Sequence, residues 1–336
     1  MLNERILLSH GAGGGASQRL LDELFFHILG NEYLLQKNDA VVLPSVQGRI
    51  ALSTDSFVVQ PLFFRGGNIG KLAVCGTVND LAVQGATPLY LTLGLIIEEG
   101  FLMADLLKIV ESIAETCAAA GVKIVAGDTK VVNKGQADGL YINTTGIGVV
   151  PEGRNISGSL AMPGDVVIIN GTIGEHGMAI MSERSGISWE TDLMSDCAPL
   201  NGLIERILTA TEEVHVMRDP TRGGVATTLN EIAAQSGVGI RLNETDLPIT
   251  DGVRGACEML GFDPLYVANE GKVLVIVPQS QAEKVLSAMH DHPLGRQAVI
   301  IGEVIADHPG LVTLRTGFGG ERILDMLEGE LLPRIC

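Results

Sequence analysis

The sequence contains no long apolar segment and no run of basic residues, and each absence excludes a class of function. No uncharged apolar stretch reaches the roughly 18 residues that a transmembrane helix needs, so we do not expect a membrane protein. The chain carries 40 acidic residues against 23 Lys and Arg, a net charge of −17, and phosphate backbones repel such a polyanion. We therefore expect neither a membrane nor a nucleic acid as partner.

Paired cysteines and a secretory leader are also missing. The five cysteines are scattered and form no Cys-x-x-Cys pair, which argues against a disulfide framework and against a structural zinc site. The first residues lack the basic start and the apolar core of a signal peptide. We expect reduced thiols and a cytoplasmic location.

Aromatic residues make up only 4% of the chain, whereas 42 of its 336 residues are glycine and 46% are hydrophobic. The hydrophobic content allows a sizeable core and excludes global disorder. The length permits two domains. The many glycines indicate tight turns, or places where the backbone comes close to a ligand.

Hydrophobic periodicity predicts helices mixed with strands along the first 150 residues. Helices are expected over 17–29, 67–86 and about 103–120, and strands over 49–59, 90–97, 122–129 and 141–150. A Pro-Gly turn followed by a strand and a glycine-rich loop (161–177) indicates a second domain. There we expect a helix over about 222–236, strands over 272–277 and 298–305, and a helix between these strands.

Strand pairs of the hairpin kind, mixed with helices, favour an α+β fold over a doubly wound parallel sheet. We expect an N-terminal domain over 1–160 and a C-terminal domain over 161–322. The last stretch, 323–336, has no strong pattern and is expected to be a flexible tail.

The glycine-rich loop SHGAGGGAS (9–17) lies between a short strand and a helix. Its backbone N–H groups and the helix N-terminus would suit a phosphate. It is not a Walker A loop, because no Lys-Ser/Thr pair follows the glycines. Gly11, Gly13 and Ala16 satisfy the dinucleotide pattern GxGxxA, but no good strand ending in an acidic residue follows at the required distance. An ordinary glycine turn remains the alternative.

Five aspartates stand where apolar segments end or break, namely Asp39, Asp55, Asp80, Asp128 and Asp219. Carboxylates at strand ends can gather around one or two Mg²⁺ ions and hold a triphosphate through them. Asp80 interrupts an otherwise apolar helix, which is costly for a buried charge without a partner or a metal. For any single aspartate the alternative is a turn or cap residue.

The chain ends in LPRIC, with Cys336 as the last residue. A cysteine on a terminal tail is expected to be mobile and exposed, so its thiol is available for chemistry that buried cysteines cannot perform. Pro333 would stiffen the approach, and Arg334 is a nearby cation. An extended tail of 14 residues could reach roughly 45 Å, enough to fold back into its own active site or to enter a partner's.

The chain resembles the HypE family of hydrogenase maturation proteins over essentially its whole length. The resemblance lies in the segments STDSFVVQPLFFRGGNIGKLAVCGTVNDLAVQGATP, GDTKVV, RDPTRGGV, ANEGK, HPLG and the terminal PRIC. The aspartate motifs are shared across the superfamily of aminoimidazole ribonucleotide synthetase and selenophosphate synthetase, whereas the PRIC ending is specific to the HypE family. The resemblance implies a two-domain PurM-like fold that forms a homodimer through strands of its N-terminal α/β domains.

The resemblance also implies a reaction. The carbamoyltransferase HypF would load a carbamoyl group onto Cys336. ATP would phosphorylate the carbamoyl oxygen, and loss of phosphate would leave a protein thiocyanate. The cyanide would pass to iron held by a HypC–HypD complex, for the active site of a nickel–iron hydrogenase.

The residue roles that the resemblance implies involve ATP and Mg²⁺. Cys336 carries the substrate, Glu270 acts as the base and Lys130 assists it. The expected metal ligands are Asp55, Asp80, Asp128 and Asp219. The expected nucleotide-binding residues are Gly13, Gly14, Asp39, Asp55, Lys71, Asn79, Asp80, Asp128, Thr129 and Arg222. Gly15 stands where the family loop often has Lys or Gln, so a side-chain contact to phosphate from that position is in doubt.

Two other functions remain open at the level of sequence. An ATP-dependent synthetase or kinase of the same superfamily, acting on a free small molecule, accounts for the aspartates but gives Cys336 no role. A non-catalytic carrier would only display its thiol for other proteins to modify. Removing Cys336 separates the first alternative from the dehydratase, and Asp80→Asn or Asp128→Asn separates an enzyme from a carrier.

Overall fold

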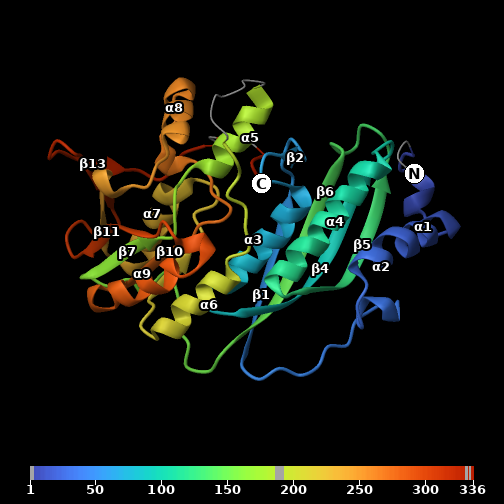
Figure 1. The fold of residues 1–336 in the computed structure, drawn as a ribbon, viewed down its shortest axis with the longest axis horizontal. Helices are drawn as coiled ribbons and strands as arrows, with labels where there is room; N and C mark the ends of the chain where they lie inside the picture. The colour runs from blue at the N-terminus through green and yellow to red at the C-terminus, as the bar shows by residue number, and fades with distance from the viewer. Residues whose placement is uncertain (1–3, 186–192, 330–331, 333) are drawn as a thin grey trace.

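The computed structural model describes residues 4–185, 193–329, 332 and 334–336. Two halves lie side by side, each built on its own β-sheet, and the C-terminus ends between them (Figure 1). Among the described residues, no helix combines the length and the apolar character needed to cross a bilayer.

The N-terminal half is a sheet with two helices on one face (Figure 1). Its strands lie in the order β1 (Arg49–Phe57), β6 (Leu140–Val150), β4 (Thr87–Glu98) and β5 (Lys123–Val132), and only the β4–β5 pair is parallel. Helices α3 (Ile69–Val83) and α4 (Met103–Ala120) pack on it. Asn68 caps α3 by accepting from two backbone N–H groups, and Gly121, in the left-handed conformation, ends α4.

A helical segment from residue 15 to residue 29 precedes this sheet. It consists of α1 (Gly15–Leu20), a π-helical turn (Leu21–Phe25) and α2 (Phe26–Leu29). Short 3₁₀ turns occupy Leu8–Gly11 and Leu34–Gln36, and a small hairpin joins β2 (Phe63–Phe64) to β3 (Gly67–Asn68).

The C-terminal half is a mixed sheet with helices on both faces. Its described strands lie in the order β13 (Glu321–Leu324), β12 (Val312–Arg315), β9 (Gly239–Asn243), β11 (Val299–Ile305), β7 (Asp165–Ile169), β10 (Leu274–Pro278) and β8 (Val216–Arg218). The helices are α5 (Glu175–Ser185), α6 (Asn201–Ala210), α7 (Gly224–Ser236), α8 (Asp251–Leu260) and α9 (Ala282–His290). Alternate residues of β7 enter the core beneath α7 and the core beneath α6 and α9, which explains why this strand is apolar throughout.

The predicted α+β fold is confirmed. The helix predicted at 103–120 has those bounds, whereas the helix predicted at 67–86 is shorter, because Asn68 caps it and the chain turns after Val83. The short strands β8, β9, β12 and β13 and the helices α6 and α8 were not predicted. One core runs from the N-terminal half into α5 and α8, so the division at residue 160, between β6 and β7, stays a prediction.

The end of the chain differs from the flexible, exposed tail that the sequence predicts. The boundary expected at 322 falls inside β13, and the described residues beyond it return to the space beside β2 and α5 (Figure 1). Ile335 is only 2% exposed and Cys336 is partly buried. The expectation of an exposed terminal thiol is therefore wrong for this structure, because the tail packs against the main core. Pro333 lies outside the described residues.

Candidate active site

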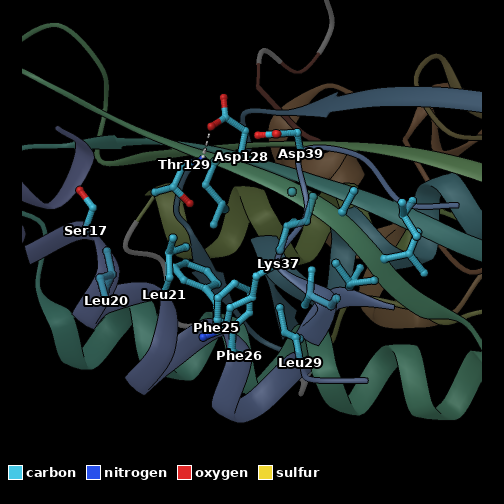
Figure 2. Close-up of a pocket in the computed structure, with 18 of the residues that line it drawn as sticks. Ser17, Leu20, Leu21, Phe25, Phe26, Leu29, Lys37, Asp39, Asp128 and Thr129 are labelled. Carbon is cyan, nitrogen blue, oxygen red and sulfur yellow. Dashed lines mark hydrogen bonds between the residues drawn. The ribbon is translucent and has the colours of Figure 1, made fainter. Parts of the chain in front are cut away.

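A cavity of about 330 Å³ lies between the N-terminal helical segment and β5. Figure 2 shows that its two ends differ in chemistry. One end is apolar, lined by Leu20, Leu21, Phe25, Phe26 and Leu29; the other carries Asp39, Asp128 and Thr129. An apolar slot that opens onto polar side chains suits a ligand with a flat ring at one end and a polar group at the other.

The glycine-rich loop borders this cavity through Gly11 and Gly13. A side chain at Gly11 would meet the backbone nitrogen of Val131 at 2.6 Å, so only glycine lets the loop lie against β5. The backbone N–H of Gly13, which the sequence predicted as a phosphate donor, already donates to Ser17 Oγ at 2.9 Å. Gly14 is the N-cap residue of α1. Because the Gly13 N–H is already used, the loop borders the cavity with fewer free donors than expected.

The sequence-predicted residues Asp39, Asp128, Thr129 and Lys130 all line the cavity. Lys130 Nζ lies 2.8 Å from Asp128 Oδ1, and both side chains are more than 60% exposed. The hydrogen bond from Lys130 lowers the pKa of Asp128, so this carboxylate is charged at neutral pH.

A second cluster of acidic residues, separate from Asp39 and Asp128 at the cavity, lies between the two halves of the molecule. Asp55 is on β1, Asp80 is near the end of α3, and Asp219 follows β8. Burial first, and then the neighbouring Asp80 carboxylate, raises the pKa of Asp55 to about 7 and that of Asp219 to about 7. Ser53 Oγ donates to Asp80 Oδ2 at 2.6 Å. These three carboxyl groups share one region and repel one another.

Glu270 belongs to the same region and is only 4% exposed. Burial, and then nearby acidic groups that include Cys197, Asp196 and Asp219, raises the pKa of Glu270 well above its ordinary value. Such a carboxylate holds a proton more tightly than an ordinary glutamate does. Arg222, near the end of the loop before α7, opposes this negative charge at Asp55 and at Cys336.

The terminal thiol completes this region. Burial, and then the charge of Glu270, raises the pKa of Cys336 to about 12, while Arg222 acts in the opposite direction. The docked thiol is therefore protonated at neutral pH and is a poor nucleophile. The structure thus brings together six of the residues that the sequence singled out: Cys336, Glu270, Asp55, Asp80, Asp219 and Arg222.

Asp196 is a site residue that sequence reasoning missed. Its carboxylate accepts from the backbone N–H groups of Glu270 and Gly271, at 3.1 and 3.2 Å, and Lys272 Nζ lies 3.0 Å away. Burial alone would raise the pKa of Asp196, but the Lys272 ammonium, His176 and the backbone N–H of Glu270 together outweigh burial and hold that pKa below its ordinary value. Asp196 therefore fixes the loop that carries Glu270. No local motif marks it, because its partners lie more than 70 residues away in the sequence.

Three predicted residues are placed elsewhere. Lys130 borders the cavity at β5, away from Glu270. Lys71 donates to the Gly66 carbonyl at 2.8 Å and does not line that cavity. Asn79 is 1% exposed, and its amide bonds the backbone of Ala198, Leu200 and Glu270, so it ties the two halves together instead of facing a ligand.

The four aspartates predicted to hold metal do not form one site in a single chain. Asp55 and Asp128 lie near the same level on the two outer strands of a four-stranded sheet, about 14 Å apart at the usual spacing of strands. Among the described residues, no three His, Cys, Asp or Glu side chains are arranged to hold a metal ion. Asp55, Asp80 and Asp219 nevertheless fit Mg²⁺ in their chemistry, because they are hard oxygen donors whose repulsion a divalent cation would relieve.

Comparisons with known proteins agree with this architecture. Residues 37–150 match the N-terminal domain of AIR synthase related proteins, and residues 162–314 match the C-terminal domain. Carbamoyl dehydratase HypE of Azotobacter vinelandii is 52% identical over 334 residues, which cover 99% of this chain and 98% of that protein.

Solved structures give the same result at the level of the fold. A crystal structure of the hydrogenase maturation protein HypE in complex with ATP superposes with a TM-score of 0.95 at 47% identity, covering 98% of this chain and 99% of that one. A crystal structure of a HypE–HypF complex superposes with a TM-score of 0.81 at 55% identity, covering 91% and 99%. With identities near one half along the whole chain and both domains matched, the protein belongs to the HypE family of AIR synthase related proteins.

Proposed function

We propose that the protein is a carbamoyl dehydratase that converts an S-carbamoyl group on its own Cys336 into a thiocyanate at the expense of ATP. The carbamoyl oxygen bonds to the γ-phosphorus as ADP leaves. The C–O bond then breaks, phosphate departs with that oxygen, and the nitrogen loses two protons to leave S–C≡N. The observation that carries the proposal is the position of Cys336, which lies in its own acidic region beside Glu270 and Asp55.

Glu270 is the group best suited to remove a proton from the carbamoyl nitrogen. It is buried, and its raised pKa makes it a strong proton acceptor. Its negative charge also raises the pKa of Cys336, which places it near the thiol. Asp196 holds its loop in place through two backbone N–H groups. Arg222 offsets the negative charge around the thiol and can stabilise a phosphorylated oxygen.

The cavity beside the glycine-rich loop is the proposed site for the nucleotide. Its apolar end suits a purine ring, and the end with Asp39, Asp128 and Thr129 suits the ribose and phosphates. The homologous HypE crystal structure in complex with ATP supports ATP as the nucleotide. Mg²⁺ held by Asp55, Asp80 and Asp219 would neutralise phosphate charge during transfer.

Loading of Cys336 requires the tail to leave its docked position. With a pKa of about 12, the docked thiol forms almost no thiolate at pH 7, and thiolate is the nucleophilic form. We infer that HypF carbamoylates the undocked tail, in keeping with the HypE–HypF complex solved for a relative. A HypC–HypD complex is the proposed acceptor of the cyanide. A cytoplasmic location is also proposed, and the free thiols of all five cysteines support it.

A homodimer is also part of the proposal. The sheet face opposite α3 and α4 exposes Ile50 and Leu52 on β1, at 68% and 67%, together with Ile96 on β4. Aliphatic side chains gathered on one open sheet face are suited to a partner. In a two-fold pairing with β1 of one copy along β5 of the other, the acidic region of one copy meets the cavity of its partner.

Intact-mass spectrometry tests the reaction. The protein is incubated with HypF, carbamoyl phosphate and MgATP, with Cys336→Ala in parallel. We expect carbamoyl addition at Cys336, and then a loss of one water that depends on ATP. Carbamoyl addition without dehydration would mean that the protein is a non-catalytic carrier of the carbamoyl group. ATP turnover on a free substrate that survives Cys336→Ala would favour the small-molecule synthetase instead.

Glu270→Gln tests the proposed base in the same assay. The amide keeps the size of the side chain but cannot accept the proton, so carbamoyl addition and ATP binding should persist while dehydration is lost. A normal yield of thiocyanate would remove Glu270 from the mechanism.

A further inference from the structure

We propose that His176 is the positioning residue that holds Cys336 in its docked place, and that it does so as a neutral imidazole with its proton on Nε2. The inference rests on the proposed function, because it concerns how the substrate-bearing residue is presented. It adds a residue from α5 that no sequence motif indicated.

The contacts of His176 connect α5 directly to the end of the chain. The side chain is completely buried. Its Nε2 lies 2.8 Å from the carbonyl oxygen of Ile335, the residue that precedes Cys336, and its Nδ1 lies 2.8 Å from Ser195 Oγ. The ring of Phe64, on β2, meets the imidazole edge-on with centroids 5.6 Å apart. The ring therefore has one orientation, fixed from both halves of the molecule.

The hydrogen-bond partners determine the tautomer. A backbone carbonyl can only accept, so Nε2 must carry a hydrogen. Ser195 Oγ accepts from the backbone N–H of Cys197 at 3.1 Å, which leaves the hydroxyl hydrogen of Ser195 free to be donated to Nδ1. Burial lowers the pKa of His176, in agreement with a neutral ring. Ser195 thus sets the tautomer that binds the tail.

His176 acts on the peptide immediately before the reactive residue, and a second bond acts on the residue itself. The backbone N–H of Val58 donates to the backbone oxygen of Cys336 at 3.1 Å. Cys336 is therefore held on both sides, by α5 from the C-terminal half and by Val58 from the N-terminal half. This double attachment directs the thiol toward Glu270 and Asp55.

Such a residue should affect the two steps of the reaction in opposite directions. Dehydration needs the docked tail, whereas carbamoylation needs the undocked tail. Loss of the His176 bond should slow dehydration and leave carbamoylation unchanged or faster. A residue with a merely structural role would not separate the two steps in this way.

The test compares His176→Ala, His176→Gln and wild type in the full-length protein. Iodoacetamide alkylation of Cys336, followed by peptide mass mapping without ATP or HypF, reports docking. We expect His176→Ala to alkylate about tenfold faster, as for the loss of one buried hydrogen bond. His176→Gln places an N–H near the position of Nε2, and should restore a rate within about twofold of wild type. In single turnovers of carbamoylated protein, His176→Ala should lower the rate of dehydration by a similar factor without changing the KM for ATP.

His290→Ala is the matched control. His290 Nε2 also bonds a backbone carbonyl, that of Ala298, at 2.9 Å, but it lies at the end of α9 and does not contact the tail. It should leave Cys336 alkylation and dehydration unchanged. If His176→Ala fails to fold by circular dichroism, Ser195→Ala replaces it, because the loss of that hydroxyl leaves Nδ1 without its donor.

Two results would overturn the proposal. One is a folded His176→Ala variant in which Cys336 alkylates at the wild-type rate. The other is a His176→Gln variant as impaired as His176→Ala. If wild type itself shows no ATP-dependent dehydration, the proposed function fails, but the alkylation rates still decide the role of His176.

Discussion

Asp196 holds the loop that carries Glu270 in the candidate active site. Its side chain is 2% exposed, it faces Lys272, whose side chain is 9% exposed, and it accepts from two backbone N–H groups of the loop that carries Glu270. A side chain at Gly271 would meet the backbone oxygen of Asp196 at 1.9 Å, so the two segments can approach only because residue 271 is glycine.

Asp196→Asn should destabilise the protein strongly, because it removes the nearer of the two carboxylates that face the buried Lys272 ammonium and leaves only Glu175, at 3.4 Å. Removing one member of a buried ion pair costs about 3–5 kcal/mol. Urea unfolding followed by circular dichroism measures the change. The control is Asp128→Asn, which breaks an exposed pair with Lys130 and should cost less than about 1 kcal/mol. A change below 1 kcal/mol for Asp196→Asn would contradict the assignment.

The docking of the tail should weaken as the pH falls below about 6.5. Burial lowers the pKa of His176 from its ordinary value of 6.5 in the docked state; Asp196 and the hydrogen bond to the Ile335 carbonyl oppose this shift, and Arg184 reinforces it, so the net direction is downward. Undocking exposes the ring and restores the ordinary pKa. The docked state therefore binds fewer protons, and acid favours release.

The measurement is the alkylation rate of Cys336 relative to that of a free peptide with the same C-terminal sequence, from pH 5.5 to pH 8. The ratio removes the titration of the thiol itself. We expect the ratio to rise toward low pH in wild type and to vary less in His176→Gln. The same rise in both proteins would show that another group controls docking.

At the scale of elements, the sequence correctly predicted those helices and strands whose bounds are set by a local pattern of residues. The apolar face of α4 and Gly121 after it define that helix without help from the rest of the chain. The tail could not be predicted in this way, because Ile335 is placed by bonds to His176 and by burial in the main core. The aspartates were recognised as a set, but only the strand order shows that Asp128 lies on the opposite edge from Asp55.

The open face of the N-terminal sheet should mediate dimerisation. Ile50→Lys combined with Leu52→Lys places two charges where the proposed partner packs. Loss of two buried aliphatic side chains, at about 1.5–3 kcal/mol each, should weaken the dimer by about 100-fold or more. Light scattering after size-exclusion chromatography measures the mass. Met259→Lys on α8 is the control, since Met259 is equally exposed, at 69%, on another face. An unchanged dimer in the double variant would place the interface elsewhere.

At the scale of the whole molecule, the polar end of the cavity and the acidic region around Cys336 are separated by the width of the N-terminal sheet. The proposed nucleotide cavity borders β5, and the acidic region with Cys336 includes β1, at the other edge. In a dimer that pairs these edges, each active site would combine the cavity of one copy with the acidic region of the other.

Co-expression of Asp80→Asn and Asp128→Asn tests this arrangement. Each variant alone should be inactive in dehydration. Half of the dimers in an equal mixture are mixed, and each mixed dimer keeps one intact site, so about a quarter of the wild-type activity should return. A mixture as inactive as its components would place each whole site within one chain.

The burial of Cys336 also bears on the lifetime of the product. A protein thiocyanate is an electrophile, and small thiols attack its carbon or its sulfur. On an exposed tail it would be consumed by any free thiol at millimolar concentration. In the docked position the same group is enclosed by Ile335, Glu270 and the main core. In the proposed reaction the docked position would therefore shield the thiocyanate as well as form it, and transfer of cyanide would begin only when the tail undocks toward its acceptor.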